Sequence, residues 1–194
     1  DAHNKTYYCF LQPQGVAPEE VNLGTGVPET EVVRRAVGIA RTKDFRHWPA
    51  PKLLLHPDAQ DPLDISFYGS CYFPYPGRQD LHVLILPVFH QVTDHVDLQI
   101  SFSRDGQVWT RPERRAILSV GPRGSGEDGQ LYPRRPPVEL PDGDWALPYM
   151  TRSSLHTVDE EYQPALFPEL KPEQHKWARW RPHRVCGVEA ENEG

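Results

Sequence analysis

The sequence predicts an all-β protein, and within that class a partial β-propeller of about two to three four-stranded blades. Three observations support this prediction. The 194 residues include 21 prolines and 14 glycines, which implies many turns and few long helices. One motif recurs at a distance of 61 residues and a second recurs at 64. Repeats of this length are typical of stacked β-sheet units.

The first repeat is a hairpin motif found in residues 39–51 and 100–112. In each copy an alternating strand runs into a Ser/Thr-x-Asp turn, and a Trp four residues after the Asp begins the next strand. The hydroxyl and the carboxylate can bond the turn backbone, while the indole covers the apolar face of the hairpin. We therefore expect structural roles for the repeated residues, which are Thr42, Asp44, Trp48 and Pro51, then Ser103, Asp105, Trp109 and Pro112.

The second repeat opens each unit. Asp64-Ile-Ser-Phe-Tyr68 matches Asp128-Gly-Gln-Leu-Tyr132, and each copy begins a run of four expected strands. The later strands of these runs are expected at 71–73, 82–90, 96–103 and 109 onward, then at 130–134, 145–151, 177–180 and 184–188, with a proline-rich loop over 153–174.

These runs divide the chain into three units. Residues 1–55 supply the later strands of a first blade, with strands expected at 5–12, 32–42 and around Trp48. Residues 56–118 form a second blade, and residues 119–194 form a third, truncated blade. Closed propellers have about four to eight blades, so we expect further blades in the full-length chain. A small β-sandwich is the alternative fold.

Composition excludes several classes of partner. The formal charge of -6 has the wrong sign for a surface that binds phosphates, so nucleic acid is not expected. The longest uncharged apolar run, 83–89, is far shorter than the roughly 20 residues of a membrane span. The three cysteines, Cys9, Cys71 and Cys186, are widely spaced without a metal-binding pattern, and we expect them to be small apolar side chains.

The hairpin sequences Ala-Arg-Thr-Lys-Asp-Phe-Arg-His-Trp and Ser-Arg-Asp-Gly-Gln-Val-Trp resemble those of five-bladed propeller glycoside hydrolases of families 32 and 43, and the likeness runs from about residue 32 onward. Together these motifs look similar to uncharacterised bacterial proteins described as glycosyl hydrolase or sialidase-like. The resemblance implies that the partial propeller belongs to a five-bladed one, and that the substrate is a carbohydrate. The Asn-Asp-Pro-Asn-Gly signature of invertases is absent, and no arginine triad of sialidases can be assigned.

Glycosidase chemistry needs two carboxyl groups, one as acid and one as base or nucleophile. In the families that the sequence resembles, such groups lie on the first strand of a blade, which lines the central channel. Asp64 and Asp128 occupy equivalent positions in neighbouring units, so we expect them to be catalytic and to face one pocket. The alternative for each is a structural cap on a loop.

Further residues are candidates for substrate binding. Asp61 and Glu127 are acids next to the expected catalytic pair and are the second choice for its roles. Tyr68, Tyr132 and His156 carry groups that can stack on or bond a sugar. His90 and His95 do not form a metal pair by spacing alone and no third ligand is evident, so neither a metal nor a cofactor is predicted. The predicted function is glycoside hydrolysis, and the alternative is a non-catalytic carbohydrate-binding or scaffold module.

Overall fold

The computed structural model describes residues 6–12, 34–78, 80–156 and 174–180. Every regular element within these ranges is a β-strand. The strands are β1 (Tyr7–Leu11), β2 (Val37–Thr42), β3 (Lys52–Leu55), β4 (Ile65–Phe67), β5 (Cys71–Pro74), β6 (His82–His90), β7 (His95–Ser103), β8 (Gln130–Pro133), β9 (Val138–Glu139), β10 (Trp145–Arg152) and β11 (Gln174–Trp180).

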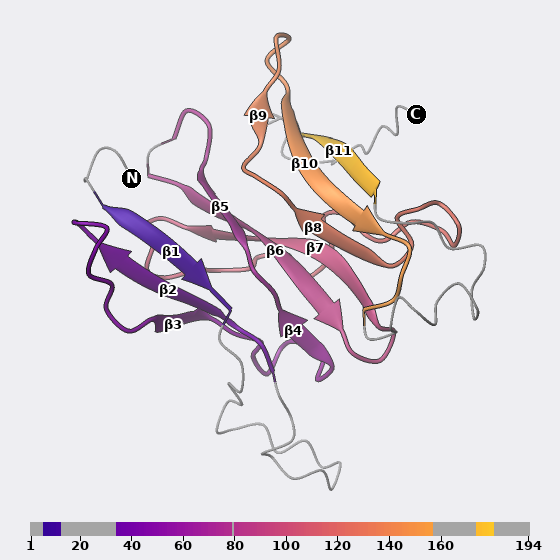
Figure 1. The fold of residues 1–194 in the computed structure, drawn as a ribbon, viewed down its shortest axis with the longest axis horizontal. Coiled ribbons are helices and arrows are strands. Elements are labelled where there is room, and N and C mark those ends of the chain that lie inside the picture. The colour runs from indigo at the N-terminus through magenta and orange to yellow at the C-terminus, as the bar shows by residue number, and fades with distance from the viewer. Residues whose placement is uncertain (1–5, 13–33, 79, 157–173, 181–194) are drawn as a thin grey trace, which may run out of the picture.

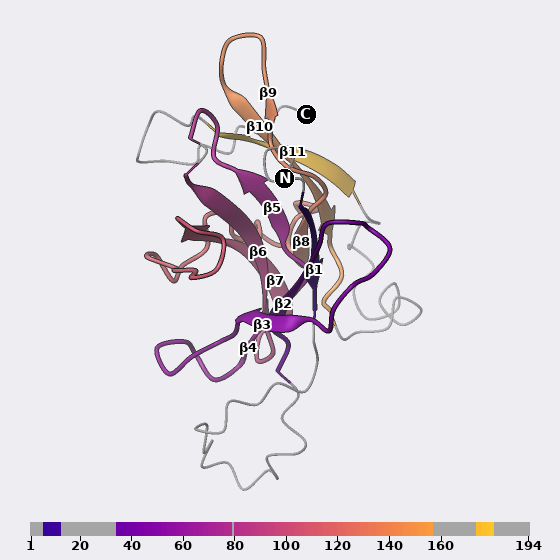
Figure 2. The ribbon, with the colours of Figure 1, turned by 90° about the vertical axis from the view of Figure 1, so that its left-hand side faces the viewer.

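These strands form two open sheets, seen from two sides in Figures 1 and 2. The first sheet is antiparallel and has the order β1-β2-β3. The second has eight strands in the order β11-β10-β8-β7-β6-β4, with β5 also paired to β6 and β9 to β10. A single parallel pair, Val96 with Gln130, joins β7 to β8. The predicted all-β class is confirmed, whereas the arrangement of blades around a propeller axis stays a prediction.

The β6–β7 hairpin forms the centre of the molecule because both of its faces are buried. One face meets the first sheet, and the other meets the part of the second sheet that contains β8 and β10 (Figure 1). Burying one such aliphatic side chain stabilises a fold by about 1.5 to 3 kcal/mol. The first interface contains Val37, Ile65, Phe67, Leu86 and Val88, and the second contains Val83, Ile85, Leu98, Leu131, Leu147 and Tyr149.

The strand opposite β6 is interrupted where it passes Pro87. Phe67 lies opposite Val88 and Cys71 lies opposite Ile85, so three residues of one strand face two of the other. Pro87 has no N–H to donate at this point, although its carbonyl accepts a hydrogen bond from the N–H of Tyr68 at 2.9 Å. The resulting bulge separates β4 from β5 and places Tyr68 at the break.

The two predicted Asp turns form the same hydrogen bonds. The Thr42 hydroxyl donates to Asp44 at 3.0 Å, and the Ser103 hydroxyl donates to Asp105 at 3.0 Å. Each Asp also accepts two backbone N–H groups further along its turn. The two tryptophans differ, because Trp109 is 9% exposed and Trp48 is 37% exposed. The prediction that Trp48 begins a strand is wrong, since β3 starts at Lys52.

Most predicted strands agree with the structure to within a few residues, but the strand expected from 109 onward is wrong, since only isolated bridges such as that between Thr110 and Phe102 form there. The exception with no sequence prediction is β9, a two-residue strand paired to β10. The strand expected at 184–188 and Cys186 lie outside the described residues. Cys71 is buried in the core and Cys9 is half-buried, and both are free thiols. Within the described residues, no helix has the length and apolarity needed to cross a membrane.

Candidate functional site

Three of the predicted substrate-binding residues come together from separate segments. Tyr68 follows β4, Tyr132 lies on β8 and His156 follows β10, yet their rings pack against one another and against Phe89 of β6. The ring centroids of Tyr68 and His156 are 5.0 Å apart, and those of Phe89 and His156 are 4.6 Å apart. We call these four residues the aromatic cluster. Tyr68 and Phe89 are buried, while Tyr132 and His156 are half-buried.

A chain of hydrogen bonds runs through the aromatic cluster and orders it. The Gln130 amide nitrogen donates to the Ser154 carbonyl at 2.8 Å, which leaves the Gln130 carbonyl oxygen as an acceptor. His156 Nδ1 lies 3.1 Å from that oxygen and must therefore carry the proton. Consequently His156 Nε2 is an acceptor, and the Tyr68 hydroxyl donates to it at 2.5 Å.

Two further groups complete this chain. The Tyr132 hydroxyl donates to Gln130 Oε1 at 2.8 Å, so that oxygen accepts from two directions. The Arg35 guanidinium donates to the Tyr68 hydroxyl and also lies over the Tyr68 ring, 4.5 Å from its centroid. Arg35 therefore adds a positive charge beside an ordered aromatic surface.

The electrostatics keep these rings neutral at physiological pH. Burial, followed by the charge of Arg35, lowers the pKa of His156 below its ordinary value, and Asp94 opposes this effect. Burial raises the pKa of Tyr68 although Arg35 lowers it. Burial also raises the pKa of Tyr132. The cluster thus presents neutral hydroxyl and imidazole groups beside a cation, a combination suited to bonding sugar hydroxyls.

Asp128 lies at the start of β8, two residues before Gln130. A side chain at the intervening Gly129 would place its Cβ only 2.1 Å from the Ser154 carbonyl oxygen, so glycine is required for this close backbone approach. Asp128 Oδ2 accepts the Gly124 N–H at 2.7 Å, which caps the preceding loop. Asp128 Oδ1 is buried and has no hydrogen-bond partner among the described residues. One carboxylate oxygen is therefore structural, and the other lacks a protein donor within the described part of the chain.

Asp64 lies at the corresponding place before β4. Its backbone carbonyl accepts the Gln91 N–H at 2.8 Å, and its Oδ2 accepts the Val92 N–H at 3.4 Å, so it holds the β6–β7 turn. The starts of β4 and β8 are three strand spacings apart in the sheet, which is about 14 Å at the backbone. Glycosidase carboxyl groups lie about 5 to 9.5 Å apart, so the two side chains have to converge to act together.

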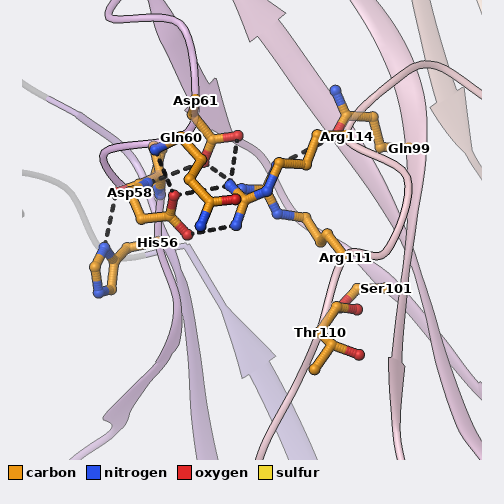
Figure 3. A network of polar contacts seen from close by, with 10 residues as sticks. His56, Asp58, Gln60, Asp61, Gln99, Ser101, Thr110, Arg111 and Arg114 are labelled. Atoms are coloured by element: carbon orange, nitrogen blue, oxygen red, sulfur yellow. Dashed lines mark hydrogen bonds and ion pairs between the residues drawn. The ribbon is translucent and has the colours of Figure 1, made fainter.

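Asp61, a predicted substrate-binding residue, lies in a buried ion-pair network shown in Figure 3. Its side chain and that of Arg111 are each 1% exposed, and Arg111 donates to Asp61 Oδ2. Arg114 bridges two acids, with Nη1 at 3.1 Å from Asp61 Oδ1 and Nη2 at 2.8 Å from Asp58 Oδ2. These ion pairs occupy both carboxylate oxygens of Asp61, and its contact with substrate stays a prediction.

Glu127, another predicted substrate-binding residue, contacts a residue of the main core. It is 8% exposed and accepts the Tyr149 hydroxyl at 3.3 Å, beside the main core. Arg34 is a buried cation that no sequence motif indicates. It is 1% exposed and donates to the Leu63 carbonyl, while its Nε and Nη1 have no hydrogen-bond partner among the described residues.

One pocket of about 440 Å³ lies between β2, β3 and the Ser103–Trp109 turn. Its lining includes Ile39, Leu54 and Gln107 but neither Asp nor Glu, so it offers no acid for catalysis. Two groups of the site, Arg35 and Gln130, were not predicted from the sequence. Gln130 lies inside the repeated motif at 128–132, which could have drawn attention to it, whereas nothing in the sequence singles out Arg35.

Comparisons with known proteins give the fold. No family model matches the chain, and no curated protein matches it. A solved structure described as a glycoside hydrolase aligns with a TM-score of 0.56 and 14% identity, covering 94% of this chain and 44% of that one. A solved complex of BT0996 with RGII aligns with a TM-score of 0.55 and 15% identity, covering 95% of this chain and 45% of that one.

A third solved structure is an N-acetylgalactosamine deacetylase from F. plautii in complex with blood group B trisaccharide. It aligns with a TM-score of 0.57 and 16% identity, covering 92% of this chain and 47% of that one. The chain spans less than half the length of each of these three structures. At these identities the alignments show a shared fold, so the chain has an all-β fold similar to that of a solved glycoside hydrolase.

Proposed function

We propose that the chain belongs to a carbohydrate-active glycoside hydrolase whose sugar site lies over the aromatic cluster. The observation that carries this proposal is the convergence of Tyr68, Tyr132 and His156 from three segments onto one ordered surface. Aromatic faces pack against the apolar faces of sugar rings, and the neighbouring Arg35 and imidazole can bond hydroxyl groups. Among the structures with the same fold, one is described as a glycoside hydrolase and another holds a trisaccharide, which supports the same class.

Within this proposal Asp64 and Asp128 are the catalytic carboxylates. Both precede strands of the second sheet, and Asp128 Oδ1 is a buried oxygen without a donor among the described residues, so a substrate group that reaches it would supply its hydrogen bond. The backbone spacing of about 14 Å favours an inverting arrangement over a retaining one, because inverting enzymes leave room for a water between the two groups.

The experiment is a hydrolysis screen with the full-length protein. The probes are 4-nitrophenyl glycosides and soluble polysaccharides, assayed for released nitrophenol or reducing ends. Asp128→Asn should lower turnover by orders of magnitude with little change in folding, because the amide keeps the shape but cannot ionise. Asp80→Asn is the matched control, since Asp80 lies just before β6, at the other end of that strand from the β6–β7 turn.

The second candidate is a non-catalytic sugar-binding module, favoured by the cap that Asp128 makes on its own loop. In that case sugars bind but are not hydrolysed, and Asp128→Asn lowers the melting temperature. Unchanged turnover in Asp128→Asn, together with a lower melting temperature, would contradict the catalytic assignment and favour the binding module.

A further inference from the structure

A group of metal-ligating side chains lies on the opposite face of the β6–β7 hairpin from the aromatic cluster. His90 ends β6, while His95 and Asp97 lie at the start of β7. The turn places Asp94 at a positive φ of 59°, and His90 lies directly opposite His95 in the register. Asp97 lies two residues further along β7 and therefore on the same face as His95. The sequence predicts no metal here, because spacing alone does not reveal the third residue.

The three side chains offer one ligand atom each within 4.8 Å of one another. His90 Nε2 is 3.0 Å and His95 Nε2 is 4.0 Å from Asp97 Oδ2. The exposed fractions of the side chains are 20% for His90, 23% for His95 and 10% for Asp97, so each is mostly buried but keeps some contact with solvent. Such spacing suits three ligands around one ion with bonds of about 2.0 to 2.2 Å.

Two further observations point to a ligand rather than to a structural ion pair alone. Asp97 Oδ1 is buried and has no hydrogen-bond partner among the described residues. His95 Nδ1 lies 2.5 Å from the Thr93 hydroxyl, and a proton on Nδ1 donated to that hydroxyl leaves Nε2 free to coordinate. The charge of Asp64 acts on both imidazoles and adds negative potential at this place.

We propose that His90, His95 and Asp97 form a binding site for a divalent transition-metal ion of the Zn²⁺ class. Two imidazoles and one carboxylate are the ligand set that such borderline ions prefer. Three protein ligands leave a coordination position for water or a ligand oxygen, as in catalytic sites, whereas structural zinc sites are closed by four. The site goes beyond the proposed function, because carboxylate-based glycoside hydrolysis requires no metal.

The test is metal binding by the full-length protein after treatment with a chelator and dialysis. Zn²⁺ is titrated by calorimetry, and Co²⁺ is titrated by its visible absorption, which reports the coordination directly. The expected result is one saturable ion at this site. His95→Gln should weaken binding by at least about 100-fold and remove the Co²⁺ absorption band, because one of three ligands is lost.

His47→Gln is the matched control. His47 is an exposed histidine whose Nδ1 lies 2.6 Å from Asp44, outside the group of three, and its loss should leave the affinity unchanged. Asp97→Asn is the second variant, and circular dichroism checks its folding. If Asp97→Asn does not fold, His95→Gln decides, since His95 lies beside the β6–β7 turn and is more exposed than Asp97. The absence of saturable Zn²⁺ uptake, or uptake that both folded variants retain, would overturn the proposal.

Discussion

The buried pair of Asp61 and Arg111 gives the sharpest stability prediction. Both side chains are 1% exposed, so Asp61→Asn leaves a buried guanidinium without its compensating charge. Breaking a buried ion pair in this way costs about 3 to 5 kcal/mol. For a protein of this size the loss corresponds to a fall in melting temperature of about 6 to 20 °C. Urea denaturation with two spectroscopic probes measures the change and checks that unfolding remains two-state.

A double variant tests the reasoning behind that number. Arg111→Met in the Asp61→Asn background removes the uncompensated charge, so it should recover part of the lost stability. Asp80→Asn breaks exposed ion pairs with Arg78 and Arg104 and should leave stability unchanged within error. If Asp61→Asn costs under about 1 kcal/mol and instead weakens sugar binding, Asp61 contacts the ligand and the structural assignment is refuted.

Three further predictions concern packing and protonation. Trp109→Ala should lower the free energy of unfolding, measured by urea denaturation, by about 3 to 5 kcal/mol. Trp48→Ala should lower it less because the Trp48 indole is 37% exposed, and equal losses would contradict the different burial of the two side chains. Gly129→Ala should destabilise by about 1 to 3 kcal/mol, as the new Cβ meets the Ser154 carbonyl, and an unchanged melting temperature would contradict this approach. Because burial lowers the pKa of His156, its contribution to stability is complete above about pH 6.5 and is lost as pH falls toward the lower folded pKa. As the pH falls from about 7.5 to 5.5, His156→Gln should therefore lose less stability than wild type. Equal losses in the two proteins would contradict the lowered pKa of His156.

The features that the sequence predicted are those that depend on local residues. The Asp turns at Asp44 and Asp105 were predictable because each is formed by side chains bonding a backbone only two or three residues away. The β6–β7 hairpin was predictable because its long apolar strand is bounded by a polar turn. The different exposure of Trp48 and Trp109 was not predictable, since similar motifs meet different neighbours in the two sheets.

In the candidate site, too, local features were predictable and long-range contacts were not. Tyr68, Tyr132 and His156 were identified by their chemistry and their places near strand ends, but their convergence depends on the pairing of β8 with β7 and β10. The ion pair of Asp61 with Arg111 could not be predicted, because the two residues are 50 positions apart in the chain. Asp97 could not be recognised as a candidate third ligand, because its nearness to His90 follows from the register of the β6–β7 hairpin. Long-range register therefore limits what sequence patterns can predict here.

Sugar binding at the aromatic cluster can be measured as an affinity whether or not the protein hydrolyses its ligand. The measurement is calorimetric titration of wild type, His156→Gln and His82→Gln with a glycoside or oligosaccharide selected by the binding and hydrolysis screen. His82 bonds Tyr72 at the start of β6, away from the cluster, and serves as the matched control. We expect His156→Gln to weaken binding by about tenfold or more, since the imidazole orders both Tyr68 and Gln130. Equal affinities for wild type and His156→Gln would contradict sugar binding at the aromatic cluster.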